Sequence, residues 1–160
     1  MLELTRLLRH LAWADAKMFD CLIELPPAAL DARYSDTAWP VGQLAMHIVG
    51  GAEWYCYCLA GRQWTDLTPP TDSDDLRTLK AHLADLNAQL LTEAELPDGV
   101  VTFVDEDGER SALRSTLLSQ AVLHSIEHRT QIATALEVSG IGGLTLDDFD
   151  LWAFEHVDGR

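Results

Sequence analysis

Three histidines have the residue type and spacing that metal binding requires. His124 and His128 stand four residues apart in a segment whose apolar pattern predicts a helix. Four steps of about 100° bring the second side chain to within about 40° of the first, one turn along the helix. Both imidazoles can therefore reach one ion at the roughly 2.0–2.1 Å that zinc ligation requires.

The surroundings of this pair favour metal binding over a chance spacing. The positions around it are mostly apolar, so we expect this helix to be largely buried; they include Leu117, Ala121, Leu123, Ile126, Ile132 and Ala135. Buried imidazole nitrogens need polar partners, and one shared ion satisfies two of them. His47 lies in the apolar run 44–49 and alone would be a core histidine. Beside the pair, we interpret it as the third ligand.

The predicted ligands His47, His124 and His128 leave at least one coordination position for something other than protein. Closed sites are usually structural, whereas open sites bind water or substrate. All-imidazole ligation suits divalent zinc, nickel, iron or copper, of which we put zinc and nickel first. The sequence indicates no catalytic residue and no general base.

The elements that position the histidines are predicted to be helices. Apolar residues recur at i, i+3, i+4 and i+7 over residues 3–25. Two further helices are predicted over 40–60 and from about 73 to the stop at 96–99, and a fourth over 115–139. The predicted N-caps are Thr71 or Ser73 for the third helix and Ser115 for the fourth.

Residues 100–104 are β-branched and aromatic, and 109–113 can return as a second strand after a turn. Thr145 with Asp148 resembles a capping box and predicts a short terminal helix through Trp152. The prediction is an all-α protein with one domain over 1–160. It is a four-helix bundle with a short β-hairpin between helices 3 and 4 and a short C-terminal helix.

Composition narrows the function classes. The net charge is −15, which repels phosphate backbones and anionic lipid, so we expect neither nucleic acid nor membrane as a partner. The three cysteines, an odd number, lie in predicted helices, which disfavours a disulfide framework. Residues 1–6 lack the apolar segment of a secretion signal, so we expect a cytoplasmic location.

Three motifs together resemble the DinB/YfiT-like family. They are Trp13-Ala14-Asp15 on the first helix, Leu44-Ala45-Met46-His47-Ile48 on the second, and His124 to Ile132, of the form H-x-x-x-H-R-x-Q-I, on the fourth. Their order and spacing cover about residues 3–155. The chain departs from the usual pattern at Asp15, where asparagine is common, and at Thr130, where glycine is common.

The resemblance implies a four-helix bundle with a histidine triad for metal, often as a homodimer. Some relatives are transferases or isomerases that use a low-molecular-weight thiol such as bacillithiol, mycothiol or glutathione. The leading hypothesis is therefore a metal-dependent thiol S-transferase acting on a small electrophile. A non-catalytic, stress-linked metal-binding module and a metal-dependent hydrolase of a small substrate are the alternatives.

Residues 124–128 also match H-x-x-E-H, an inverted zinc-peptidase motif in which Glu127 is the base. We disfavour it because Glu127 lies about 100° from His128 around the helix and only a short segment follows. Glu127 is then a solvated or supporting carboxylate.

Outside the motifs, we expect His10, His82 and His156 to be exposed. Cys56 and Cys58 are expected to be small core or boundary residues, since their spacing points them to different helix faces. Three tryptophans, Trp39, Trp54 and Trp64, are expected to fill the core, with the mouth of a pocket as the alternative.

Overall fold

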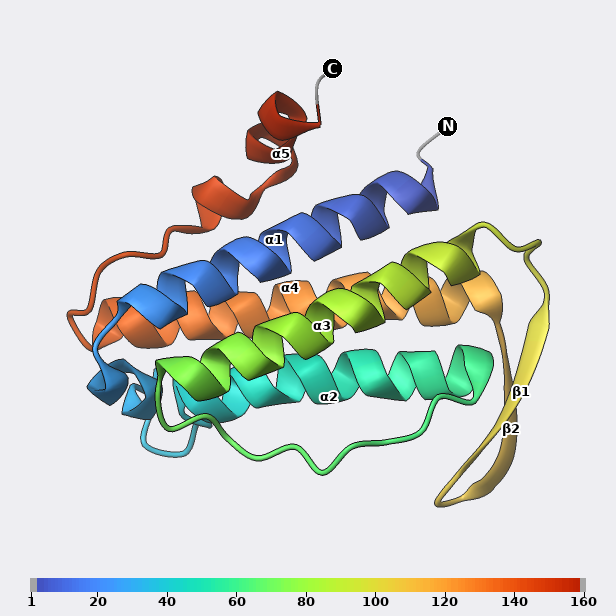
Figure 1. Ribbon diagram of the computed structural model, residues 1–160, viewed down its shortest axis with the longest axis horizontal. Helices are drawn as coiled ribbons and strands as arrows, with labels where there is room; N and C mark the ends of the chain where they lie inside the picture. The colour runs from blue at the N-terminus through green and yellow to red at the C-terminus, as the bar shows by residue number, and fades with distance from the viewer. Residues whose placement is uncertain (1–2, 159–160) are drawn as a thin grey trace.

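The computed structural model of the protein describes residues 3–158, which form helices and one hairpin (Figure 1). The elements in chain order are α1 (Leu4–Glu24), η1 (Pro27–Asp31), α2 (Val41–Ala60), α3 (Ser73–Ala94), β1 (Val100–Asp105), β2 (Gly108–Leu113), α4 (Arg114–Val138), η2 (Leu146–Phe149) and α5 (Leu151–Val157). The mostly helical class with one antiparallel hairpin is confirmed. Residues 1–2 and 159–160 lie outside the described residues. The first pair belongs to the segment expected to lack a secretion signal, and both pairs belong to the predicted domain.

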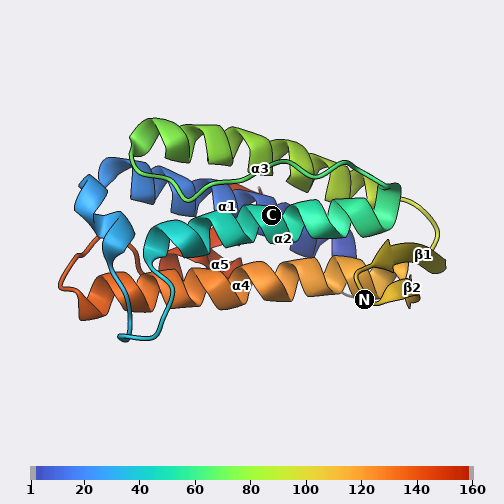
Figure 2. The same ribbon diagram turned by 90° about the horizontal axis from the view of Figure 1, so that it is seen from below.

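The four long helices pack around one apolar core (Figures 1 and 2). Helix α1 packs chiefly on α3, and α2 chiefly on α4, while the contacts of α2 with α3 and of α1 with α4 complete the arrangement. The connection 61–72 runs back along α2 and α3, so these two helices point the same way (Figure 2). Leu8, Met18, Phe19, Leu44, Ile48, Leu86, Ile132 and Leu136 are among the fully buried side chains.

Helix ends follow the expected chemistry, but two caps differ from the prediction. Asp72 caps α3, because its carboxylate accepts from the backbone N–H groups of Asp74 and Asp75, so neither Thr71 nor Ser73 is the cap. Helix α4 begins one residue earlier than predicted, at Arg114. Ser115 therefore lies inside the helix, where Asp98 accepts from both its backbone N–H and its hydroxyl.

The hairpin joins α3 to α4 at one end of the molecule (Figure 1). Its register pairs Val100 with Leu113 and Asp105 with Gly108, so the strands are one residue longer at the turn than predicted. Gly108 has φ 113°, which favours glycine at this position. No helix in the described part of the chain is long and apolar enough to span a membrane.

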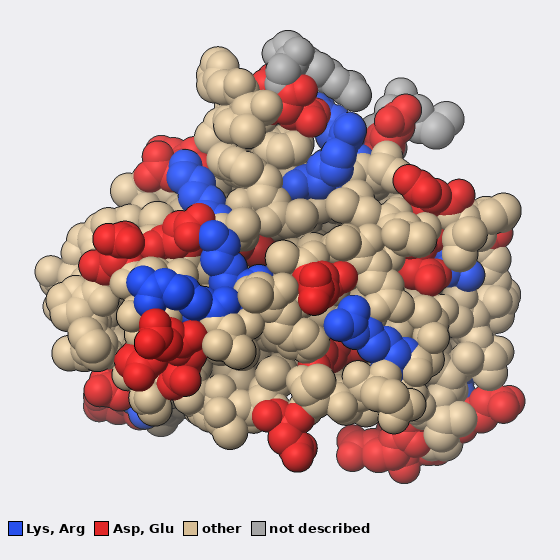
Figure 3. Space-filling model, viewed as in Figure 1, with Lys and Arg blue, Asp and Glu red and all other residues tan. Residues whose placement is uncertain are grey.

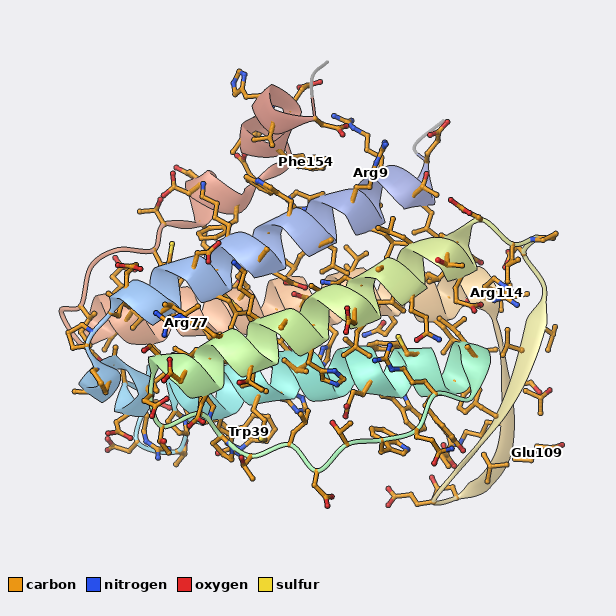
Figure 4. All side chains as sticks on the ribbon, in the orientation of Figure 1. Arg9, Trp39, Arg77, Glu109, Arg114 and Phe154 are labelled. Carbon is orange, nitrogen blue, oxygen red and sulfur yellow. The ribbon has the colours of Figure 1, made fainter. Side chains whose placement is uncertain are left out.

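The C-terminal segment differs from the single helix predicted over Thr145–Trp152. It forms η2 and then α5, which begins after Asp150, whose carboxylate accepts from Ala153 N–H. This segment covers α1, and Figure 4 shows Phe154 pointing toward that helix. His10 hydrogen-bonds through Nε2 to Phe149 O at 2.6 Å and is only 5% exposed, so its predicted exposure was wrong.

Helix α4 is less buried than its apolar sequence predicted. Leu123 is 58% exposed and Ile126 40% exposed, because they lie on the side of α4 that faces away from the core. Charged side chains of both signs are interspersed over the face seen in Figure 3. His156 is exposed as expected.

A buried ion pair links three of the long helices. Arg129 of α4 donates from Nη1 to Asp15 Oδ1 of α1 at 2.8 Å, and both side chains are almost fully buried. Ser125 Oγ donates to the same carboxylate oxygen at 2.5 Å, and Asn87 Nδ2 of α3 donates to Oδ2 at 3.2 Å. Burial raises the pKa of Asp15, and the Arg129 charge opposes this.

Replacing Asp15 should show how strongly the fold depends on this pair. Asp15→Ala leaves Arg129 buried without its partner, so we expect it to lower the free energy of unfolding by about 3–5 kcal/mol. Asp15→Asn should cost less, because an amide oxygen still accepts from Arg129 and Ser125. Urea unfolding measures both, and the control is Asp20→Ala at the exposed Lys80–Asp20 pair, expected to cost about 1 kcal/mol or less. Equal losses for Asp15→Ala and Asp20→Ala would contradict a special role for the buried pair.

Candidate metal centre

Three imidazoles converge between α2 and α4. His47 comes from α2, and His124 and His128 come from successive turns of α4. Their ring centroids lie 4.5–5.0 Å apart. One nitrogen of each ring lies within 4.8 Å of the others, and the Nε2 atoms of His47 and His124 are 3.2 Å apart. The structure thus brings together all three residues that the sequence predicted as ligands.

The protonation of the triad suits metal binding. Burial, followed by repulsion from His128 and from His47, lowers the pKa of His124 to about 4. Burial, followed by repulsion from His128, also lowers the pKa of His47. Metal ligation requires neutral imidazole, so at neutral pH these two ligands have no proton to lose. The donor set fits a divalent ion such as zinc, nickel, iron or copper.

Gln131 sets the orientation of His128. Its side-chain oxygen lies 2.7 Å from His128 Nδ1 and can only accept, so Nδ1 carries the hydrogen. The other ring nitrogen, Nε2, then keeps its lone pair for a ligand, as in metal sites where a second group fixes the histidine. The sequence analysis missed this role. The sequence did contain a signal for it, since Gln131 is polar and follows His128 by three positions, which places both side chains on the same face of the helix.

Gly51 makes room for His124 between the two helices. A Cβ atom at this position would lie 2.2 Å from Cε1 and 2.6 Å from Nδ1 of the His124 ring. No side chain larger than hydrogen fits unless the ring moves away from His47. At neighbouring Gly50, a Cβ would meet only Leu67 Cδ1, at 3.8 Å.

Two clefts reach the triad from the surface. One, of about 200 Å³, has Tyr34, Thr37 and Trp39 on one side and His128 with Gln131 on the other. Trp39 is 44% exposed and its ring centroid lies 4.8 Å from that of His47, beside the first half of α2 (Figure 4). The other cleft, of about 330 Å³, has His47 at one side and Glu53 and Trp64 at the other.

The tryptophans therefore line clefts, and the expectation that they fill the core was wrong. Trp39, just before α2, and Trp64, in the connection after it, are exposed, and Trp54 on α2 is half-buried. His82 was also expected to be exposed. It is partly buried, and its Nε2 lies 2.7 Å from Oε1 of buried Glu53, which also accepts from Thr65.

Other candidate groups lie apart from the triad. Glu127 is exposed and, among residues 3–158, no further His, Cys, Asp or Glu joins the three histidines. Cys56 and Cys58 are buried, as expected, and burial raises the pKa of Cys56 to about 12 and that of Cys58 to about 11. Cys21 is free as well. These thiols are protonated at neutral pH and are therefore poor nucleophiles.

Fold and site together define a helical protein with a three-histidine group that could hold a metal ion and that is open to solvent clefts. The DinB family model matches residues 1–156, and the chain belongs to this family. No curated protein matches the chain.

Gly51→Ala should test the close approach of α2 to His124. The added methyl group overlaps the ring, so we expect the free energy of unfolding to fall by about 1–3 kcal/mol. The matched control is Gly50→Ala, where space is available and alanine improves helix propensity by up to about 1 kcal/mol. Urea unfolding compares the two variants. If both gain stability alike, the contact between Gly51 and His124 does not constrain the site.

Proposed function

We propose that the chain is a single-domain, DinB-type four-helix bundle that binds one divalent metal ion through His47, His124 and His128. The convergence of three half-buried imidazoles within 4.8 Å is the observation that carries the proposal. Zinc and nickel are the first candidates, and iron and copper also suit imidazole ligands. Gln131 holds His128 with one nitrogen turned to the ion, and Gly51 lets His124 reach it.

We propose further that the protein is a thiol S-transferase acting on a small electrophile. Three protein ligands leave a position for an outside ligand, and the clefts at His128 and His47 give it access. When bound, the metal would lower the pKa of a thiol, whose proton would pass to solvent, and hold its sulfur near the electrophile. The new carbon–sulfur bond would replace the bond between carbon and the electrophile's leaving group, which would depart to solvent. The protein's own buried cysteines are protonated, so the thiol comes from a separate small molecule.

We assign the chain's residues around the site to binding and orienting the reactants. Trp39 and Tyr34 form one wall of the cleft at His128, where a small apolar electrophile can be held against aromatic surface. Burial and repulsion between the rings lower the pKa of His47 and of His124, which favours the neutral form that a metal ligand needs.

Metal analysis of protein purified without an affinity tag tests the first proposal. We expect about one divalent ion per chain in the wild type, and little in His124→Ala, which removes one of three ligands. His156→Ala is the matched control, since this histidine is exposed on α5, and it should keep its metal. Equal and negligible metal in the wild type and in His124→Ala would refute the site.

A panel of thiols tests the second proposal. Bacillithiol, mycothiol and glutathione are each incubated with a model electrophile, with metal present and after its removal by chelation. We expect conjugation with at least one thiol that needs the metal and is lost in His124→Ala. Metal binding without conjugation of any thiol would instead favour a non-catalytic module, and cleavage of a small ester would favour a hydrolase.

A further inference from the structure

A third cleft, of about 450 Å³, lies where the C-terminal half of α2 meets the hairpin. One wall consists of the rings of Trp54, Tyr57 and Trp64, and the other is the hairpin segment 104–107. Tyr57 donates from its hydroxyl to Val104 O at 2.8 Å, which ties the hairpin to α2 across the cleft. This cleft contains none of the three histidines of the metal centre.

The aromatic wall is a continuous surface. The centroids of Trp54, Tyr57 and Trp64 lie 5.6–5.7 Å apart, with interplanar angles of 28–34°. Phe103 of β1 packs edge-on against Trp54, with centroids 5.7 Å apart, and supports the wall from behind. Trp64 is 51% exposed, so much of its ring is available to a ligand. Leaving so much apolar area in contact with water is unfavourable, which suggests that the ring has a binding role.

The opposite rim is acidic. Asp105, Glu106 and Asp107 all line the cleft, and no lysine or arginine does so among the described residues. Arg110 pairs with Asp105 at 2.6 Å and with Asp107, which leaves the rim with a net negative charge. Figure 3 shows acidic side chains at the lower right, where Figure 1 places the tip of the hairpin.

We propose that this cleft binds the ammonium group of a small organic molecule. The face of an aromatic ring attracts cations, and quaternary ammonium groups are commonly held by several rings together. The negatively charged carboxylates of the rim also attract a cation. A bare metal ion is the weaker alternative, because within residues 3–158 only the three histidines converge closely enough to hold one.

The cleft also connects with the metal centre through one residue. Trp64 lines both this cleft and the one that contains His47 and Glu53. A molecule with its ammonium group on the aromatic wall and long enough to pass Trp64 would extend along α2 toward the triad. If the proposed transferase function holds, this assigns the class of its substrate: a small molecule that carries a permanent or protonated ammonium group.

Choline and its uncharged isostere 3,3-dimethylbutan-1-ol are the probes that separate cation binding from simple apolar contact. The full chain is titrated in EDTA, so that the result does not depend on the triad, and the indole N–H signals are followed by NMR. We expect choline to bind about fivefold more tightly than the isostere, or better. The signals of Trp54 and Trp64 should shift, and that of exposed Trp152 on α5 should not.

Three variants locate the binding. Trp64→Leu keeps apolar surface but removes a ring, and should weaken choline binding about twofold to fivefold with little effect on the isostere. Glu106→Gln removes a negative charge from the rim and should weaken choline binding about twofold to fivefold. The matched control is Glu109→Gln, whose side chain lies on the same hairpin but outside the cleft and points away from the helices (Figure 4); it should bind choline as the wild type does.

Equal affinity for choline and the isostere would overturn the proposal, as would shifts confined to other tryptophans. Both results would leave the metal centre untouched, because metal content and thiol conjugation are measured separately. Conversely, choline binding to the metal-free protein would support the ammonium site even if the thiol-conjugation test refutes the proposed transferase function.

Discussion

The buried pair between Asp15 and Arg129 constrains the rest of the structure, because it fixes the rotation of α4. Ser125 and Arg129 are four residues apart on α4 and both donate to Asp15. His124 and His128 each precede one of these residues, so they lie about 100° around the helix from them. Holding one stripe of α4 against α1 and α3 therefore turns the neighbouring stripe, with its two imidazoles, toward α2.

The same constraint accounts for an aspartate at position 15. An asparagine there could accept from Arg129 but would leave its charge uncompensated. Aspartate supplies the opposite charge in a place where desolvation is expensive. The network also borders the histidine triad, since Asp15, Asn87, His124 and Ser125 line one small void. Fold stability and ligand placement thus depend on the same side chains.

Local patterns predicted the helices well, because apolar spacing depends on residues close in sequence. The i, i+4 spacing also placed His124 and His128 correctly on one face of α4, where the structure brings them together with His47. Predictions of side-chain exposure were wrong where segments distant in the sequence determine whether a residue is covered. Nothing near His10 in the sequence reveals that the C-terminal segment covers it, and nothing near Leu123 reveals that this side of α4 is uncovered among the described residues.

The prediction that the tryptophans fill the core was wrong for a related reason. A bulky apolar residue gains most from burial, so the core is the default expectation for Trp54 and Trp64. Whether they reach it depends on which side of α2 meets α3 and α4, and on the path of 61–72, neither of which is local. The role of Gly51 was equally hidden. The ring that fills the space beside this glycine belongs to a residue 73 positions away in sequence.

Helix α2 links the two kinds of chemistry that the protein can offer. Its first half supplies His47 and faces the imidazoles of α4, and its second half supplies Trp54 and Tyr57 and faces carboxylates on the hairpin. A cation is disfavoured beside a metal ion and favoured beside aromatic rings and acids. One molecule bound along α2 would therefore have a fixed direction, with its charged end at the hairpin and its other end at the triad. The field of the protein, as well as the shape of its clefts, would set that orientation.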